Sequence, residues 1–230
     1  MGLWSFCFRG LCFNHQDGEN GQRKVVGVML GSQAKTIHFI RHAEGTHNKG
    51  AAEYGPGIYL NEEYADARLT EVGKEQCAKL KADNPGLKET KLVVISPLSR
   101  AIQTALLSIE QVEGVPWIAL ECARERSGNH PCDRRRPVHE LKEDFPTIIF
   151  DNIDEGEDKL YDANERESEE SLMKRAKNLL DWLSGRTETN IVVVTHGVLL
   201  TCFFNEVLMA PANLAKRFEN GELRTLNMEF

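Results

Sequence analysis

Three short apolar runs, each ending at a polar turn, place the strongest constraint on the fold. They are rich in β-branched residues and cover Thr36–Ile40, Lys91–Ile95 and Ile191–Thr195. Continuous apolar runs of this length are typical of strands that are buried on both faces of a parallel sheet. Parallel strands need a crossover connection, and segments with a helical pattern lie between the runs. The sequence therefore predicts alternating strands and helices.

Four segments carry the helical pattern. Thr70 is an N-cap residue for a helix that runs to Lys81, and the spacing of apolar residues predicts helices over Leu98–Val112 and Leu172–Leu183. A fourth helix is expected from Val198 to about Met209. It is nearly all apolar, which places it in the interior of the protein.

The order of these elements predicts an α/β fold of the doubly wound kind, a three-layer α/β/α sandwich around a mostly parallel sheet. The run after Gly221 is expected to add one antiparallel edge strand, with Leu226, Met228 and Phe230 on one face. A chain of 230 residues can bury enough apolar surface for one stable domain. We expect that domain to cover residues 35–230.

Residues 121–167 do not fit the alternating pattern. They contain Pro131, Pro137 and Pro146, many charges and no sustained period apart from an apolar patch at Ile148–Phe150. A stretch of this length in a compact domain is more often a functional lid or insertion than a simple connector.

Residues 1–34 are expected to form a tail that is partly flexible. Its first part, Met1 to Phe13, is aromatic and contains cysteine, but Arg9 and Gly10 interrupt the apolar run that a secretory signal needs. A frayed tail is the favoured interpretation. Contact of residues 1–13 with a membrane surface is the alternative.

The composition excludes several classes of partner. The net charge is −7, so the chain has no general electrostatic attraction to nucleic acid or anionic lipid. The six cysteines show neither a paired nor a metal-finger spacing, which favours a reducing compartment, the cytoplasm. Cys132 and Cys202 have no base in a recognisable pattern nearby, and we interpret them as inert thiols.

Chemically active residues follow the three predicted strands directly. Arg41 and His42 follow the first strand, Arg100 lies shortly after the second, and His196 follows the third. In doubly wound sheets, ligands bind beyond the carboxyl ends of the strands, where these residues should meet. Two histidines and two arginines would form a local cationic pocket in an acidic protein, which suits an anionic substrate.

Four sequence blocks carry a resemblance to a known family. They are Arg41-His42-Ala43-Glu44-Gly45-Thr46-His47-Asn48, Leu69-Thr70-x-x-Gly73-x-x-Gln76, Ser96-Pro97-Leu98-x-Arg100-Ala101-x-Gln103-Thr104-Ala105 and Thr195-His196-Gly197. In this order they resemble the blocks of the histidine phosphatase superfamily, in its phosphoglycerate mutase-like branch. Ala43 stands where the common family pattern has glycine. We expect this difference to affect the backbone conformation of the first loop and not the chemistry.

The resemblance implies a role for each residue of the blocks. His42 would be the nucleophile that forms a phosphohistidine, and the phosphoryl group would be bound by the following residues: Arg41, Thr46, Asn48, Arg100 and His196. Phosphoryl transfer depends mainly on positioning and positive charge, for which the arginine fork is well suited. Neither a metal nor another cofactor is expected. The substrate would be a small phosphorylated molecule.

The family takes a proton donor from an acidic residue in the insertion. Glu125 is the best match, in a setting that partial burial would make suitable for a general acid, and Glu121 is its nearest competitor. The basic cluster of Arg134, Arg135 and Arg136 could bind a second anionic group of the substrate, with Arg134 as the candidate. Such clusters are more often solvated surface charges, and that alternative stays open. His47 and His130 are expected only at the edge of the site.

Three functions remain open at this point. A phosphomonoester hydrolase is favoured, because the stretch Gly128–Arg134 lacks the signature and the later basic block of the glycolytic mutases. A phosphoglycerate mutase, which is an isomerase, is the first alternative. The second alternative is a catalytically weak module that uses the phosphate pocket to bind a partner.

Overall fold

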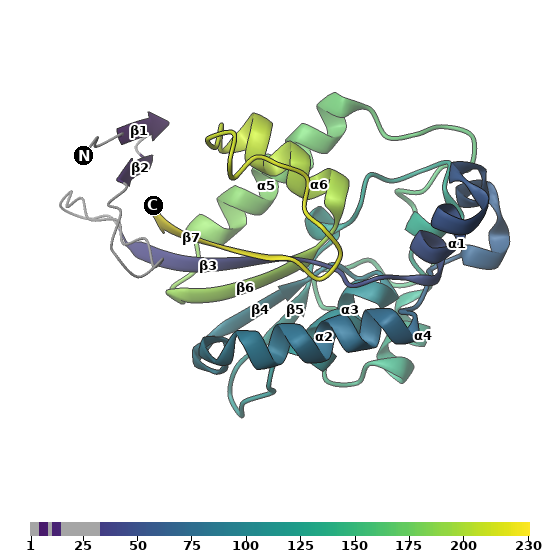
Figure 1. The fold of residues 1–230 in the computed structure, drawn as a ribbon, viewed down its shortest axis with the longest axis horizontal. Helices are drawn as coiled ribbons and strands as arrows, with labels where there is room; N and C mark the ends of the chain where they lie inside the picture. The colour runs from purple at the N-terminus through teal and green to yellow at the C-terminus, as the bar shows by residue number, and fades with distance from the viewer. Residues whose placement is uncertain (1–4, 9–10, 15–32) are drawn as a thin grey trace.

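A five-stranded sheet forms the centre of the protein in the computed structural model, which describes residues 5–8, 11–14 and 33–230. The strands lie in the order β5-β4-β6-β3-β7 (Figure 1). Their bounds are Ala34–Arg41 for β3, Leu92–Ile95 for β4, Trp117–Ala119 for β5, Asn190–Thr195 for β6 and Leu223–Glu229 for β7. The three strands predicted from the apolar runs are β3, β4 and β6.

All strand pairs are parallel except the last one. β6 pairs in parallel with both β3 and β4, and β4 pairs in parallel with β5. β7 is antiparallel to β3 and forms an edge of the sheet. The predicted doubly wound sheet with one antiparallel edge strand is confirmed.

Helices cover both faces of the sheet (Figure 1). The α-helices are α1 Thr46–Tyr54, α2 Glu71–Asp83, α3 Ser99–Ser108, α4 Val138–Asp144, α5 Glu169–Ser184 and α6 Gly197–Cys202, and a π-helical turn, Phe203–Val207, continues α6. Short 3-10 helices are η1 Pro56–Leu60, η2 Glu62–Tyr64, η3 Pro85–Glu89, η4 Glu121–Ala123 and η5 Pro131–Asp133. α5 and α6 cover one face, while α2 and α3 lie on the other (Figure 1).

Each face of the sheet packs into its own hydrophobic core. Val193 in β6 points into the core beneath α5 and α6, whereas its neighbours Val192 and Val194 point into the core beneath α2 and α3. All three valines are fully buried. This two-sided burial explains why the sequence of the strand is apolar without alternation. Leu226 and Met228 of β7, together with Phe230 directly after it, contact the α5–α6 core, as predicted.

Two predicted helices end earlier than expected, and one begins earlier. The helix predicted over Leu98–Val112 ends at Ser108, because Ile109 has an extended backbone although its side chain is still in the core. The apolar helix after His196 leaves α-helical geometry at Phe203. α5 begins at Glu169, since Ser168 accepts a hydrogen bond from the Ser171 amide and caps the helix.

The N-terminal region contributes two short strands, β1 Ser5–Phe8 and β2 Leu11–Asn14, which pair with each other as a separate antiparallel sheet. The other residues before Gln33 lie outside the described residues. The predicted partly flexible tail over residues 1–34 and the alternative of membrane contact by residues 1–13 fall largely on these residues and stay predictions. Among the helices that the structure describes, none has the length and apolar character needed to cross a membrane.

The N-terminus of α2 supports the loop that follows β3. Thr70 caps this helix by accepting from the Gly73 amide, and its hydroxyl donates to a carboxylate oxygen of Glu44 at 2.6 Å. A Cβ atom at Gly73 would lie 2.2 Å from the Glu44 carbonyl oxygen, which is closer than real contacts allow. The loop and the helix therefore fit together only with glycine at this position.

We expect Gly73→Ala to destabilise the protein by about 1–3 kcal/mol, because the new methyl group forces the backbone of Glu44 away from the helix. Urea unfolding measures the effect. Gly86→Ala is the matched control, since a Cβ atom there meets nothing within 4 Å. Equal stabilities of the two variants would contradict the proposed contact.

Candidate active site

The loops that leave β3, β4 and β6 meet at one small cavity, which we call the His42 cavity. Its volume is about 140 Å³. Its lining includes these residues singled out from the sequence: Arg41, His42, His47, Asn48, Arg100, Glu125 and His130. The fully buried His196 is not part of the lining, but its ring centroid lies 5.0 Å from that of His42.

His42 is held with one ring nitrogen directed at the protein backbone. Its Nδ1 lies 2.7 Å from the carbonyl oxygen of Ala43. Because a carbonyl oxygen can only accept, Nδ1 must carry the proton and Nε2 must carry the lone pair. The Nε group of Arg100 donates to that Nε2 at 3.3 Å. His42 thus presents an unprotonated nitrogen next to a guanidinium group.

Arg100 is buried and is oriented by the insertion. Its guanidinium donates to the carbonyl oxygen of Cys132 and, at 2.8 Å, to a carboxylate oxygen of Asp133. The other carboxylate oxygen of Asp133 accepts from Arg166 at 2.9 Å. Both arginine side chains are thereby fixed by one buried carboxylate, and a buried pair with such additional hydrogen bonds defines a single geometry.

Arg41 and His196 are each fixed through one nitrogen. Nη1 of Arg41 donates to the carbonyl oxygen of Phe218 at 2.7 Å, and Nε2 of His196 lies 2.6 Å from the Ser96 hydroxyl. A Cβ atom at Gly197 would lie 3.2 Å from Nε of Arg41. The glycine after His196 therefore leaves room for the guanidinium group.

Three buried nitrogens around His42 have no hydrogen-bond partner among the residues that the structure describes. They are Nε of Arg41, Nδ1 of His47 and Nδ1 of His196. Nearly all buried polar atoms in proteins are paired, so a group of unpaired ones calls for an explanation. An anion with several oxygens in the His42 cavity would supply acceptors for such donors. The residues present thus fit a phosphoryl group.

The surroundings keep the imidazoles neutral. Burial lowers the pKa of His42 well below its ordinary value, and the charges of Arg100 and Arg41 and the neighbouring His47 lower it further. Burial followed by the charge of Arg100 also lowers the pKa values of His47 and His196. A neutral imidazole is the form that can act as a nucleophile.

The remaining predicted phosphate-binding residues differ in their positions. Asn48 lines the cavity, and its side-chain oxygen accepts from the Gly45 amide at 3.0 Å. Thr46 begins α1 with an exposed side chain and is not part of the lining. Arg134 also lies outside the lining, where it pairs with Glu62 and stacks over the ring of Tyr161. Its role in binding substrate stays a prediction.

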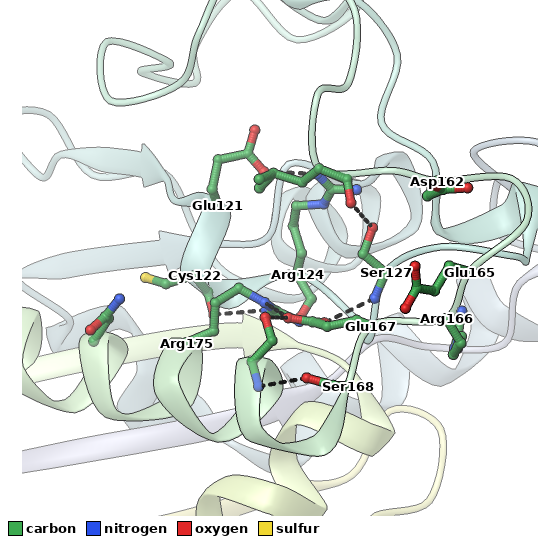
Figure 2. Close-up of a pocket in the computed structure, with 13 residues that line it drawn as sticks. Glu121, Cys122, Arg124, Ser127, Asp162, Glu165, Arg166, Glu167, Ser168 and Arg175 are labelled. Carbon is green, nitrogen blue, oxygen red and sulfur yellow. Dashed lines mark hydrogen bonds and ion pairs between the residues drawn. The ribbon is translucent and has the colours of Figure 1, made fainter.

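The two candidate proton donors face different cavities. Glu125 lines the His42 cavity and accepts from the backbone amides of Val198 and Leu199, each at 3.1 Å. Glu121 instead accepts from Arg124 at 3.0 Å and from Arg135 at 2.9 Å. It lines a separate cavity of about 530 Å³, the insertion cavity (Figure 2). Only Glu125 is placed next to the predicted nucleophile.

A partly buried ion pair positions the Glu125 segment. Arg175 of α5 donates to the carbonyl oxygens of Arg124 at 2.8 Å and of Glu125 at 3.0 Å, and to a carboxylate oxygen of Glu167 at 2.6 Å. The same Glu167 oxygen accepts from the Ser127 amide (Figure 2). This Arg175–Glu167 pair ties α5 to the loop that carries Glu125.

Several cavity residues were not predicted from the sequence. They are Tyr59, Asp133, Arg166, Val198 and Arg217, and His47 is buried beside His42 and not only at the edge. Apart from Val198, which follows β6 closely, these residues lie away from the ends of the predicted strands, so no periodic signal marks them. In the described ranges, no group of three or more His, Cys, Asp or Glu residues is arranged to hold a metal ion.

We expect the free energy of unfolding to fall as the pH is lowered from about 7 to about 5. Below about 6.5 the unfolded chain binds protons at His42, His47 and His196 that the folded site excludes, and each such histidine contributes up to about 1.4 kcal/mol per pH unit. The lowered pKa values of Asp158 and Glu167 act only below about pH 4–5.

Urea unfolding at several pH values measures this slope. His47→Gln removes one of the three imidazoles and should flatten the slope relative to the unchanged protein. An identical slope in the two proteins would contradict the burial of a neutral imidazole at position 47.

Comparisons with known proteins identify the family of this chain. A family model of the histidine phosphatase superfamily (branch 1) matches residues 37–229. The chain is 34% identical over 205 residues to a "Phosphoglycerate mutase-like protein" of Arabidopsis thaliana, covering 76% of this chain and 75% of the relative.

Two solved structures share the fold. One is the alpha-ribazole phosphatase from Shigella flexneri, with a TM-score of 0.56, 21% identity and coverage of 83% of this chain and 89% of that one. The other is the phosphoglycerate mutase from Bacillus anthracis, with a TM-score of 0.54, 20% identity and coverage of 84% and 88%. Fold, ordered blocks and family match agree, and the chain belongs to the histidine phosphatase superfamily, branch 1.

Proposed function

We propose that this protein hydrolyses phosphomonoesters through a phosphohistidine intermediate on His42. The observation that carries this proposal is the unprotonated Nε2 of His42, which lies 3.3 Å from the Arg100 guanidinium in a cavity that Arg41 also lines. A nucleophile and paired cationic donors around one small cavity are what phosphoryl transfer requires. The names of relatives and structural neighbours include both phosphatases and mutases.

In the first step, Nε2 of His42 attacks phosphorus, and the bond from phosphorus to the leaving oxygen breaks. Arg41, Arg100 and His196 donate to the three phosphoryl oxygens, which carry the negative charge in the transition state. Glu125, in its protonated form, gives its proton to the leaving oxygen. The Nδ1 contact with Ala43 stabilises the imidazole as it becomes positive.

In the second step, a water molecule attacks phosphorus and the bond to Nε2 breaks. Glu125, now ionised, takes a proton from that water, which releases inorganic phosphate and restores both residues. The site thus returns to its starting protonation state without a further reactant.

The ion pairs of the three insertion arginines favour hydrolysis over mutase action. Arg134 pairs with Glu62, Arg135 pairs with Glu121 at 2.9 Å, and Arg136 pairs with Asp66 at 2.9 Å. Because each of these arginines is paired with a carboxylate of the protein, none of them is an unpaired cation that could hold the carboxylate of phosphoglycerate without giving up that partner. A mutase needs its reaction product to stay bound for re-phosphorylation, whereas a hydrolase releases it.

We expect His42→Ala to lower phosphate release from p-nitrophenyl phosphate by at least about a thousandfold, because the nucleophile is lost. His139→Ala is the control, since its side chain is exposed on α4. The unchanged protein should also form an acid-labile, alkali-stable phosphoenzyme that His42→Ala lacks. Full activity of His42→Ala would refute the mechanism, and rapid interconversion of phosphoglycerates without phosphate release would favour the mutase.

Glu125→Gln should affect esters according to their leaving groups. An alkyl phosphate needs a proton on its leaving oxygen, so its kcat/KM should fall by about a hundredfold or more. The kcat/KM of p-nitrophenyl phosphate should fall by less than about tenfold, because nitrophenolate leaves without protonation. Glu121→Gln should change both substrates alike. A leaving-group dependence in Glu121→Gln and not in Glu125→Gln would assign the proton donor to Glu121.

A further inference from the structure

A second cavity adjoins the His42 cavity and shares part of its wall. Its volume is about 420 Å³, which lies in the range of small-molecule sites. Arg41, Asn48, Tyr59 and Arg217 line both cavities. A phosphate ester held at His42 would therefore have its alcohol part beside this adjoining cavity.

The walls of the adjoining cavity differ in character. One wall is largely apolar and comes from α1 and η1, with Ala51, Ala52, Pro56 and Tyr59. The Tyr59 ring stacks on His130, with centroids 5.3 Å apart and planes inclined by 25°. A flat aromatic surface of this kind suits a flat or ring-containing leaving group.

The opposite wall comes from the segment before β7 and carries Arg217. The side chain of Arg217 is exposed, and it makes no ion pair with any residue that the structure describes. Its backbone is held in place, because the Arg217 carbonyl oxygen accepts from Arg224, and the carbonyl oxygen of the next residue, Phe218, accepts from Arg41.

Arg217 thereby differs from the arginines of the insertion. Arg134, Arg135 and Arg136 are each neutralised by a carboxylate of the protein. Glu219 is on the same wall as Arg217 but makes no ion pair with it. Arg217 is thus a cation placed at the boundary of both cavities with its donors available to a ligand.

We propose that Arg217 binds a second anionic group, a carboxylate or a phosphate, on the leaving group of the substrate, while the apolar wall around Tyr59 contacts its body. This inference rests on the proposed function. The substrate class is then a phosphomonoester whose alcohol part carries a ring-sized body and a negative charge. Guanidinium groups bind both anions through paired hydrogen bonds.

The test compares 4-carboxyphenyl phosphate with 4-carbamoylphenyl phosphate, which have similar shapes and differ in the charge of the leaving group. Phosphate release gives kcat/KM for each. Arg217→Gln should lower the ratio of the charged to the neutral substrate by about ten- to a hundredfold, the effect expected for the loss of a hydrogen bond to a charged group. Arg217→Lys should recover part of this ratio.

Lys216→Gln is the matched control. It removes the same charge one residue earlier, from an exposed side chain that lines neither cavity, and should leave the ratio within about twofold. An unchanged ratio in Arg217→Gln would overturn the inference, and so would equal changes in Arg217→Gln and Lys216→Gln. A changed ratio in Arg134→Gln alone would move the anion site to the insertion.

These failures are distinct from a failure of the proposed function. If His42→Ala is inactive on both substrates and Arg217→Gln keeps the original ratio, only the role of Arg217 is refuted. If His42→Ala stays active on both, the phosphohistidine mechanism itself is refuted. Thermal unfolding of each variant shows that the compared proteins are folded.

Discussion

The parallel register of β3, β6 and β4 is the constraint on which the site depends. Arg41 lies opposite Thr195, and Val194 lies opposite Ile95 on the other side of β6. The residues that follow, His42, Ser96 and His196, therefore leave the sheet at the same level. Because both faces of these strands are buried, a shift of one residue would interchange the side chains of the two hydrophobic cores, so packing also fixes the register that brings the proposed catalytic residues together.

A carboxylate of the insertion stabilises the positive charge at the His42 cavity of this acidic protein. Arg100 is almost fully buried, a position that is costly for a charge without a partner. Asp133 supplies that partner, and Arg166 shares it from the other side. The pair leaves Nε of Arg100 directed at His42. The insertion therefore takes part in the site through the groups that hold Arg100, and not only as a cover over it.

The sequence was sufficient for the parts of the site that lie next to a strand. Arg41, His42, Arg100 and His196 could be placed because apolar runs identify strands and parallel strands end at a common edge. Asp133 and Arg217 could not, since they lie in segments without a period and reach the cavity through long-range contacts. The insertion was recognised as a region, but the partners of its arginines depend on contacts that no local pattern encodes.

A single turn after β6 links three parts of the proposed mechanism. It carries His196, its Gly197 lies against the guanidinium of Arg41, and its next two amides hold Glu125. Arg175 holds the other side of the Glu125 segment from α5. The proposed phosphate-binding groups and the proposed proton donor are thus fixed to one another through backbone contacts, which would leave little reorganisation for the reaction itself. The proposed substrate-selecting residue Arg217 differs from these groups, because its side chain makes no ion pair with any residue that the structure describes.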